Sequence, residues 1–461
     1  MQRSVRRWLV GALTAAMASA GAVTVTPPPA SADLTATADT VYYWNSVLQE
    51  TFRRQGGGPG PLARAAAIMH AGVHDAINSA WWSTQQGVGN GYHNYGVDWI
   101  VGPQVDGDLA AGYTARDLLV AALPAQAAYV QQAFTDRYGT RSQTDARRLA
   151  DLVINGDKYD RVGDGSADTT SYTLDNVPGA WRPTGNTCLT AANAVDPHWG
   201  AVKPFSLTSG SQFRRSGPAG YTSYSALLSS SAYATQVNEV KALGRATGST
   251  RTADQTQAAW FWANDLDGTY KPPGQYLALT ETVSRARLTE ARQVARLFAR
   301  VGLAMADASI AAWDEKYRTS LDLWRPETAI QLADTDNNPA TVADPAWRPL
   351  SADRSNVSFS PCFPAWVSGH ATIGAAWAGI MRSTFGDAVS FVGRTEDPHA
   401  VGVTRSFTSF TQAATENARS RIYLGVHYSF DGDDGQAIGY DVASWVYPRH
   451  FGTFNCPITC W

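Results

Sequence analysis

The sequence predicts an all-α protein of two packed helical bundles joined by long ordered loops. Apolar residues recur at helical spacing in several long stretches, whereas no stretch shows convincing strand alternation and no fixed-period repeat is visible. Apolar residues make up 44% of the 461 residues and charged residues 17%, a composition typical of an ordered globular chain with a large core. We expect one domain over 33–461.

Helical periodicity is clearest in "PLARAAAIMHAGVHDAINSAWW" (61–82), where a proline near the start suits the first helical turn. The same pattern predicts further helices at 107–138, 145–162, 233–247, 281–317, 366–384, 411–424 and 434–446. We expect a break in the longest of them near Gly302. The Pro-, Gly- and Trp-rich segments 165–224 and 333–362 are expected to be ordered loops packed over the helices.

The N-terminus reads as a secretory signal peptide. Arg3, Arg6 and Arg7 precede an apolar run, and small residues follow up to Ala32, so we expect cleavage after Ala32 and export of the mature protein. The run is too short and too rich in small residues for a stable membrane anchor. The formal net charge of −3 argues against nucleic acid as a partner.

The four cysteines are Cys188, Cys362, Cys456 and Cys460. Export would allow them to pair, in any of three connectivities, and their spacing is not that of a zinc site. We expect at least one disulfide. A bridge at Cys362 would fix the loop that leads into "FPAWVSGHATIGAAW" (363–377).

That stretch places Ser368, Gly369 and His370 at the start of a predicted helix. Singly, each has an ordinary structural explanation: a helix cap for the serine and a carbonyl-bonded buried ring for the histidine. A helix start is also an anion site, because its free N–H groups and the helix dipole favour negative charge. His370 is in position to move protons.

Two arginines and a second histidine complete the pattern. Arg325 in "DLWRPETAI" and Arg421 carry forked guanidinium groups that suit a tetrahedral oxyanion. His427 follows Arg421 by six residues, about 120° apart on a continuing helix, so both could reach one pocket. Asp431, four residues after His427, could accept the Nδ1 proton and leave Nε2 free. Together these residues predict an oxyanion pocket with one histidine for the central atom and one for acid–base work.

The Arg-Pro, Ser-Gly-His and "SRIYLGVHYSFD" motifs resemble the three-part signature of the superfamily of type 2 phosphatidic acid phosphatases, bacterial acid phosphatases and vanadium-dependent haloperoxidases. The wider text, including "ADASIAAWDEKY", "YYWNSVLQETFR" and "PHWGAVKPF", is similar to bacterial relatives of the vanadium chloroperoxidases. This resemblance extends over most of the chain and implies a two-bundle fold with vanadate as cofactor.

By the resemblance, His427 would bond the vanadium of vanadate, or the phosphorus of a phosphate, and His370 would be the acid–base residue. The oxyanion oxygens would be held by Arg325, Arg421, Ser368 and the Gly369 amide.

The resemblance also implies a halide pocket at Phe363 and Trp313. Asp265 in "FWANDLDG" resembles a supporting acid that orients one of the arginines, and Asp431 supports the histidine.

One further cation departs from the family pattern of Lys, six residues, then Arg-Pro. Lys316 is separated from Arg325 by eight residues, while Arg318 occupies the position seven before Arg325. On a helix a spacing of seven is nearly co-facial and nine is nearly opposite. We therefore favour Arg318 as the cation, with Lys316 as the alternative if the helix bulges. An arginine would neutralise the oxyanion but polarise bound peroxide less well.

The expected activity is that of a secreted, vanadate-dependent haloperoxidase that uses hydrogen peroxide to oxidise halide to hypohalous acid, with an organic acceptor as the third small molecule. One alternative is a phosphomonoesterase with a phosphohistidine at His427 and His370 as leaving-group acid. Another is a non-catalytic oxyanion-binding homologue, against which the intact His370 argues.

Two other polar clusters have simpler explanations. His70, His74 and Asp75 in "MHAGVHDAIN" lack the glutamate of a zinc-protease motif, and we expect a buried helix–helix contact there. The "DGDDG" run (431–435) lacks the ligand spacing of a calcium loop and is expected to begin a helix.

Overall fold

The computed structural model describes residues 34–87, 89–185 and 187–456. The predicted signal peptide and Cys460 lie outside the described residues, as does the side chain of Cys456. All described residues belong to one unit that begins at Leu34. None of the described helices is long and apolar enough to cross a membrane.

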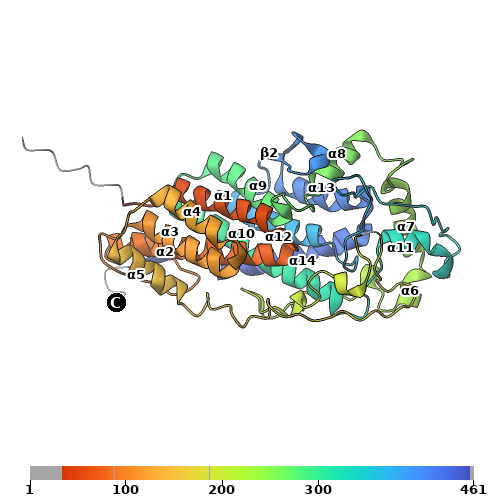
Figure 1. Ribbon diagram of the computed structural model, residues 1–461, viewed down its shortest axis with the longest axis horizontal. Helices are drawn as coiled ribbons and strands as arrows, with labels where there is room; N and C mark the ends of the chain where they lie inside the picture. The colour runs from red at the N-terminus through yellow and green to blue at the C-terminus, as the bar shows by residue number, and fades with distance from the viewer. Residues whose placement is uncertain (1–33, 88, 186, 457–461) are drawn as a thin grey trace, which may run out of the picture. The chain divides into compact units, whose positions relative to one another are not determined.

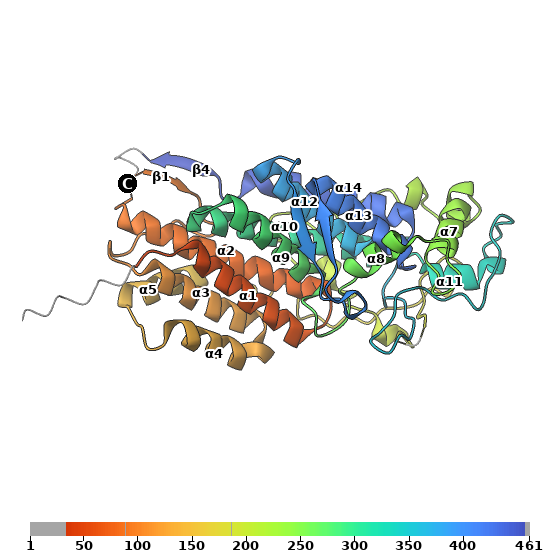
Figure 2. The ribbon, with the colours of Figure 1, turned by 90° about the horizontal axis from the view of Figure 1, so that it is seen from above.

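Two helical bundles make up this unit, as the sequence predicts (Figure 1). The first bundle contains α1 (Ala38–Gln55), α2 (Pro59–Thr84), α3 (Gly107–Ala122), α4 (Ala127–Tyr138) and α5 (Thr144–Ile154). The second is built on α12 (Gly369–Phe385), α13 (Phe410–Tyr423) and α14 (Ser429–Arg449). The long α10 (Ala291–Tyr317) packs against α2 and also against α12 and α14, so it joins the bundles (Figure 2).

Five further helices among the described residues complete the fold. These are α6 (Tyr224–Leu228), α7 (Ser231–Leu243), α8 (Ala253–Phe261), α9 (Lys271–Arg287) and α11 (Pro326–Gln331). Short 3-10 turns occur at Pro124–Gln126, Ala191–Asn193, Trp199–Ala201, Pro218–Gly220, Ala333–Thr335 and Pro398–Ala400. The helices α1, α6, α8 and α11 had no counterpart among the predicted ones.

The expected break near Gly302 is wrong. Residue 302 lies inside the continuous α10, and the chain breaks instead between α9 and α10. A Cβ on Gly302 would lie 3.0 Å from the Cα of Ala67 in α2. The glycine is therefore a point of close approach between two helices, where the absence of a side chain serves packing rather than chain reversal.

Two other boundaries differ from the prediction for local reasons. The expected helix at 107–138 is divided at Leu123, because Pro124 begins a short 3-10 turn before α4. The expected helix at 145–162 ends at Ile154, where Asn155 and Gly156 follow.

Among the described residues, four short strands form two antiparallel pairs. β1 (Gly89–Tyr92) pairs with β4 (Thr453–Cys456), and β2 (Phe391–Arg394) pairs with β3 (Thr404–Phe407). Each strand has only four residues, too few for the alternation that would reveal it in the sequence.

The long loops are packed, as expected. Trp181, Trp199 and Trp347 are buried at 0–1% exposure in segments outside the α-helices. A disulfide between Cys188 and Cys362 ties two of these segments together, with Cα atoms 5.3 Å apart, which confirms the prediction of at least one bridge. The bridge closes the large loop that carries α6 to α11.

The His70 cluster is the predicted buried helix contact. The His70 ring packs on Phe298 of α10 at 4.9 Å, and His74 packs on Phe451 at 4.5 Å. The Asp75 carboxylate accepts three hydrogen bonds from neighbouring segments. Residues 431–435 lie in the first turns of α14, also as predicted.

Candidate active site

Four element ends meet around one cavity. The last turn of α10 carries Lys316, the start of α12 carries Ser368, the last turn of α13 carries Arg421, and the turn before α14 carries His427. The cavity has a volume of about 660 Å³, and its lining includes Trp313, Phe363, Gly369, His370, Arg421 and His427. The structure thus brings together residues from four separate motifs.

His427 is held in one tautomer. Its Nδ1 donates to the Asp431 carboxylate at 2.9 Å, and the Tyr428 amide donates to the same oxygen at 3.0 Å. Burial, reinforced by the charges of Arg325 and Lys316, lowers the pKa of His427 well below its usual value. The ring is therefore neutral, and Nε2 carries the lone pair.

The predicted contact between Nδ1 of His427 and Asp431 is confirmed. The two residues do not, however, lie on one continuous helix. The α13 helix ends at Tyr423, and Asp431 sits in the first turn of α14 after a turn in the chain. Burial raises the pKa of Asp431 to about 7, although the Tyr428 amide and the Lys316 charge oppose this shift. The acid is fully buried, so its geometry is fixed by the helix start.

The two arginines leave three donors without partners. Arg325 donates from Nε to the Phe363 carbonyl at 2.7 Å and from Nη1 to the Val426 carbonyl at 2.8 Å. Arg421 donates from Nη2 to Asp265 at 2.8 Å, which places this acid as the motif comparison implies. Nη2 of Arg325 and both Nε and Nη1 of Arg421 are buried without a hydrogen-bond partner in the described part of the chain.

Such buried donors are costly unless a ligand accepts from them. Burial lowers the pKa of Arg325 to about 9, with Arg421 adding to the effect, so the two positive charges lie close enough to repel each other. Nη1 of Arg325 is also 3.1 Å from Nε2 of His427. An oxyanion bonded at Nε2 fits this donor set, because it would accept from both guanidinium groups and relieve their repulsion.

Ser368 and Gly369 form the start of α12. The Ser368 hydroxyl oxygen accepts from the Ala371 amide at 3.4 Å as the helix cap, which leaves the hydroxyl proton free to donate. The Ser368 amide donates to the Asp431 carbonyl at 2.9 Å and thereby ties α12 to α14. A Cβ on Gly369 would lie 3.1 Å from the Trp313 ring, so the glycine allows that ring to cover the helix start.

His370 faces a carbonyl and an acid. Its Nε2 is 3.1 Å from the Ala263 carbonyl oxygen and 3.7 Å from Asp265. A carbonyl can only accept, so Nε2 carries the proton and Nδ1 carries the lone pair. Burial, and then the Arg421 charge, lowers the pKa of His370 to about 4. The Arg421 charge, against the raising effect of burial, holds the pKa of Asp265 below its usual value.

Contrary to the expectation that it fills the cation position, Arg318 lies outside the pocket. The α10 helix ends at Tyr317, so helical counting back from Arg325 does not apply across the loop between them. Arg318 caps the helix, is 50% exposed at its side chain and lies 3.5 Å from Asp314. It belongs to the outer face of the helix end.

Lys316 occupies the interior instead. Its side chain is fully buried, and Nζ donates to the carbonyls of Pro364 at 2.7 Å and Ala365 at 3.1 Å. Burial, and then the Arg325 charge, lowers the pKa of Lys316 well below its usual value. The two extra residues between Lys316 and Arg325, relative to the family pattern, therefore lie in the loop between α10 and α11. A lysine thus remains beside the pocket.

The two aromatic residues expected beside the halide do lie together. The rings of Trp313 and Phe363 have centroids 5.2 Å apart, and both residues line the cavity. Lys316 Nζ lies 4.8 Å from the Phe363 ring centroid and Arg325 Cζ lies 4.5 Å from it. An apolar wall backed by cations is suited to a weakly hydrated anion.

Sequence reasoning missed two contributors to the site. The Ala263 carbonyl that fixes the His370 tautomer is a backbone group, so residue identity says nothing about it. The strap, defined here as residues 187–196, forms part of the cavity wall through Asn193, Val195 and Asp196 among others. Cys188 at its start was the one hint, because a disulfide to Cys362 brings the strap beside Phe363.

Glu315, next to Lys316, gives a testable pH dependence. Its side chain is buried, and burial raises its pKa to about 8, with Arg215 N–H as the partner of one oxygen. A raised folded-state pKa adds stability below the ordinary value of 4.5, and this stability is lost as the pH rises through 8. Glu315→Gln should therefore raise the free energy of unfolding at about pH 9 much more than at about pH 5, with a slope of at most about 1.4 kcal/mol per pH unit. Urea denaturation at both pH values measures it, and an equal change at both would contradict it.

The chain is similar to known proteins of one kind. Residues 296–455 match the family described as the VCPO second helical-bundle domain. The vanadium chloroperoxidase of Curvularia inaequalis is 30% identical over 233 residues, a match that covers 39% of this chain and 37% of that protein. The chain thus spans little more than a third of the length of that curated relative.

Solved structures cover far more of the chain. The crystal structure of a bacterial vanadium-dependent iodoperoxidase matches with a TM-score of 0.74 and 24% identity, over 90% of this chain and 97% of that one. An apo-type bacterial vanadium-dependent chloroperoxidase matches with a TM-score of 0.60 and 16% identity, over 92% and 95%. The fold is therefore that of the vanadium-dependent haloperoxidases. The resemblance stated from the motifs is confirmed, and residues 296–455 are similar to the second helical-bundle domain of that family.

Proposed function

We propose that this protein is a vanadate-dependent haloperoxidase, which oxidises halide with hydrogen peroxide. The observation that carries the proposal is the set of three buried, unpartnered guanidinium donors of Arg325 and Arg421 beside the unprotonated Nε2 of His427. That arrangement suits an oxyanion whose central atom accepts a nitrogen ligand. Vanadate is such an oxyanion, and the relatives are vanadium haloperoxidases by name.

The residues divide into three tasks. His427 would hold the vanadium at Nε2, while Arg325, Arg421, Lys316, Ser368 and the Gly369 amide would hold the oxygens. When bound, vanadate would supply Lewis-acid activation of peroxide oxygen without a change of oxidation state. Phe363 and Trp313 would provide the wall against which the halide approaches.

His370 would move the proton. Nε2–H is donated to the Ala263 carbonyl, so Nδ1 is the nitrogen that can take up a proton. The low pKa keeps the ring neutral in the free protein, ready to act as a base. Asp265, shared between Arg421 and His370, would position both side chains.

The activity test uses the mature protein freed of metal and titrated with orthovanadate. Bromide, hydrogen peroxide and an activated phenol should give brominated phenol in proportion to bound vanadate. The same preparation without vanadate is the control. Protein that binds vanadate, yet brominates no faster than this control, would contradict the proposal.

Phosphomonoester hydrolysis is the second candidate, because a neutral His427 with an unprotonated Nε2 is also the form needed for nucleophilic attack on phosphorus. Rapid quenching with an aryl phosphate would then trap a phosphohistidine at residue 427. A non-catalytic anion binder would lack both activities. His370→Ala separates the classes, since an enzyme should lose turnover while keeping the anion.

Export is part of the proposal. The motivating feature is the N-terminal arginine cluster, the apolar run and the small residues that end at Ala32. Protein recovered from the culture medium should begin at Asp33 on N-terminal sequencing. Recovery of the intact chain only from inside the cell would contradict this.

A further inference from the structure

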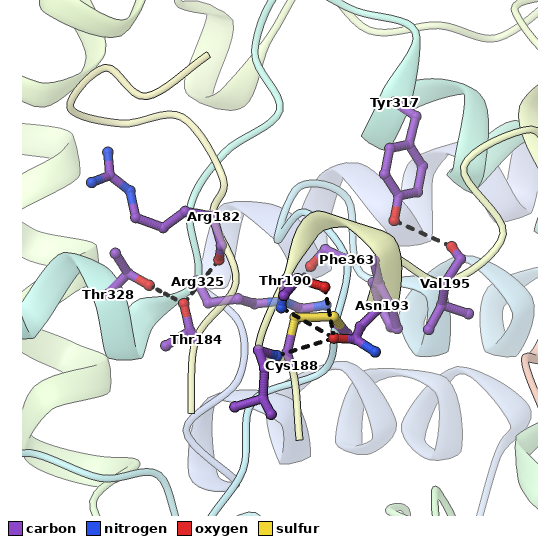
Figure 3. Close-up of a disulfide and its surroundings, with 12 residues drawn as sticks. Arg182, Thr184, Cys188, Thr190, Asn193, Val195, Tyr317, Arg325, Thr328 and Phe363 are labelled. Carbon is purple, nitrogen blue, oxygen red and sulfur yellow. Dashed lines mark hydrogen bonds between the residues drawn. A yellow bond between two sulfur atoms is a disulfide. The ribbon is translucent and has the colours of Figure 1, made fainter. Parts of the chain in front are cut away.

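The strap is fixed firmly against the active-site cavity. The Cys188–Cys362 disulfide holds its start, and the Val195 amide donates to the Cys362 carbonyl at 2.9 Å near its end. The Val195 carbonyl accepts from Trp313 Nε1 at 3.1 Å and from the Tyr317 hydroxyl at 3.2 Å. Figure 3 shows this hydroxyl contact and the disulfide close to Phe363. The position of the next residue, Asp196, is therefore set by the structure rather than by a mobile loop.

Asp196 lines the cavity in an unusual state. Its backbone φ is 50°, in the left-handed region, and its Oδ2 is buried without a hydrogen-bond partner among the described residues. Burial raises its pKa, against a weaker opposing effect of His198. A buried acceptor without a donor is unfavourable, so a donor supplied by a ligand would be stabilising.

The other carboxylates that line this cavity are already engaged. Asp265 pairs with Arg421 at 2.8 Å, and Asp267 pairs with Lys271 at 2.6 Å. Asp353 accepts backbone N–H groups of its own turn at 2.8 and 2.9 Å. Asp196 differs from them, because it lines the cavity while no arginine or lysine is paired with its carboxylate in the described chain.

The cavity is also larger than a halide needs. Its volume of about 660 Å³ lies in the range typical of small-molecule sites, and Trp313 and Phe363 provide aromatic surface. A carboxylate beside aromatic rings is the combination that recognises an ammonium group on an aromatic molecule.

We propose that the cavity binds the organic acceptor, and that Asp196 makes it selective for aromatic acceptors that carry a protonated amine. This inference rests on the proposed haloperoxidase function, which supplies the hypohalous acid. The acceptor's ring C–H bond would be replaced by a carbon–halogen bond, and the displaced hydrogen would leave with the hydroxyl of the hypohalous acid as water. Asp196 takes no part in that step; its task is to hold the ammonium group.

The test is a competition between two phenols of nearly the same shape. Tyramine carries the ammonium group, and 4-ethylphenol lacks it. Vanadate-loaded enzyme, bromide and peroxide are supplied with both, and the product ratio gives the ratio of their kcat/KM values. The same mixture treated with reagent hypobromous acid gives the intrinsic ratio. We expect the enzyme to favour tyramine by about tenfold over that intrinsic ratio, as one hydrogen bond to a charged group allows.

Asp196→Asn should return the ratio to the intrinsic value while 4-ethylphenol is still brominated. Asp267→Asn is the matched control, because it removes the same charge from a 76% exposed carboxylate that is already paired with Lys271, and it should keep the preference. A wild-type ratio equal to that of the reagent would overturn the inference without use of any variant. So would an undiminished preference in Asp196→Asn.

Equilibrium dialysis of tyramine against vanadate-free protein separates this inference from the proposed function. If the wild type retains tyramine and Asp196→Asn does not, the role of Asp196 in holding the ammonium group is supported, even if the protein halogenates nothing. If 4-ethylphenol is brominated but tyramine is not retained by the wild type, the haloperoxidase function stands and the acceptor site is refuted.

Discussion

Replacing His427 with alanine should abolish vanadate binding and, with it, halide oxidation. Nε2 of His427 is the unprotonated ring nitrogen beside the unpartnered donors of Arg325 and Arg421. Loss of a group that merely orients a ligand costs about 10–100-fold in affinity, so loss of the ligand itself should cost more than about 100-fold. Equilibrium dialysis of vanadate measures the affinity, and thermal unfolding checks that the variant is folded.

The matched control is His93→Ala, which removes an imidazole that is 55% exposed. This variant should bind vanadate as the wild type does. If folded His427→Ala retained wild-type affinity, the anion would be held by the arginines and the helix start alone, and His427 would have no bonding role.

The second large effect is expected at Lys316. Lys316→Met keeps an apolar chain of similar length in the buried position but removes the amino group beside Arg325 and His427. Vanadate affinity should fall by about 1.5–3 kcal/mol, the range for a hydrogen bond to a charged group. Arg318→Ala should be nearly silent, because that side chain is half exposed and directed to Asp314.

The lysine also predicts a proton uptake. Burial lowers the pKa of Lys316 in the free protein, and a bound anion would favour its charged form. Calorimetric titration with vanadate in two buffers of different ionisation enthalpy should show more protons taken up by wild type than by Lys316→Met. A loss of affinity in Arg318→Ala with none in Lys316→Met would restore the assignment that the sequence favoured.

The motifs predicted which segments form the site, but not which residue at the end of α10 lies beside it. Ser368, Gly369, Arg421 and His427 could be identified because each sits in a local motif whose spacing is preserved. Lys316 could not be distinguished from Arg318 because the answer depends on where α10 ends, and helix ends are set by capping and tertiary contacts. Counting on an ideal helix across a loop favoured Arg318, whose side chain the structure places on the outer face.

In the fold too, features set by local sequence were predicted, whereas features set by tertiary contacts were not. Long alanine-rich periodic stretches were correctly predicted as helices, since their pattern depends on burial alone. Gly302 was misread because a glycine in a helix can mark either a break or a close contact, and only the neighbouring Ala67 in α2 decides which. The tautomer of His370 and the state of Asp196 depend on backbone groups and on a strap far away in sequence.

A crystal structure of the vanadate-loaded protein, with vanadium located from its anomalous scattering, tests the central claim most directly. The account predicts a single vanadium peak bonded to Nε2 of His427, with the guanidinium donors of Arg325 and Arg421 and the ammonium of Lys316 directed at its oxygens. A vanadium peak elsewhere, or none at saturating vanadate, would contradict it.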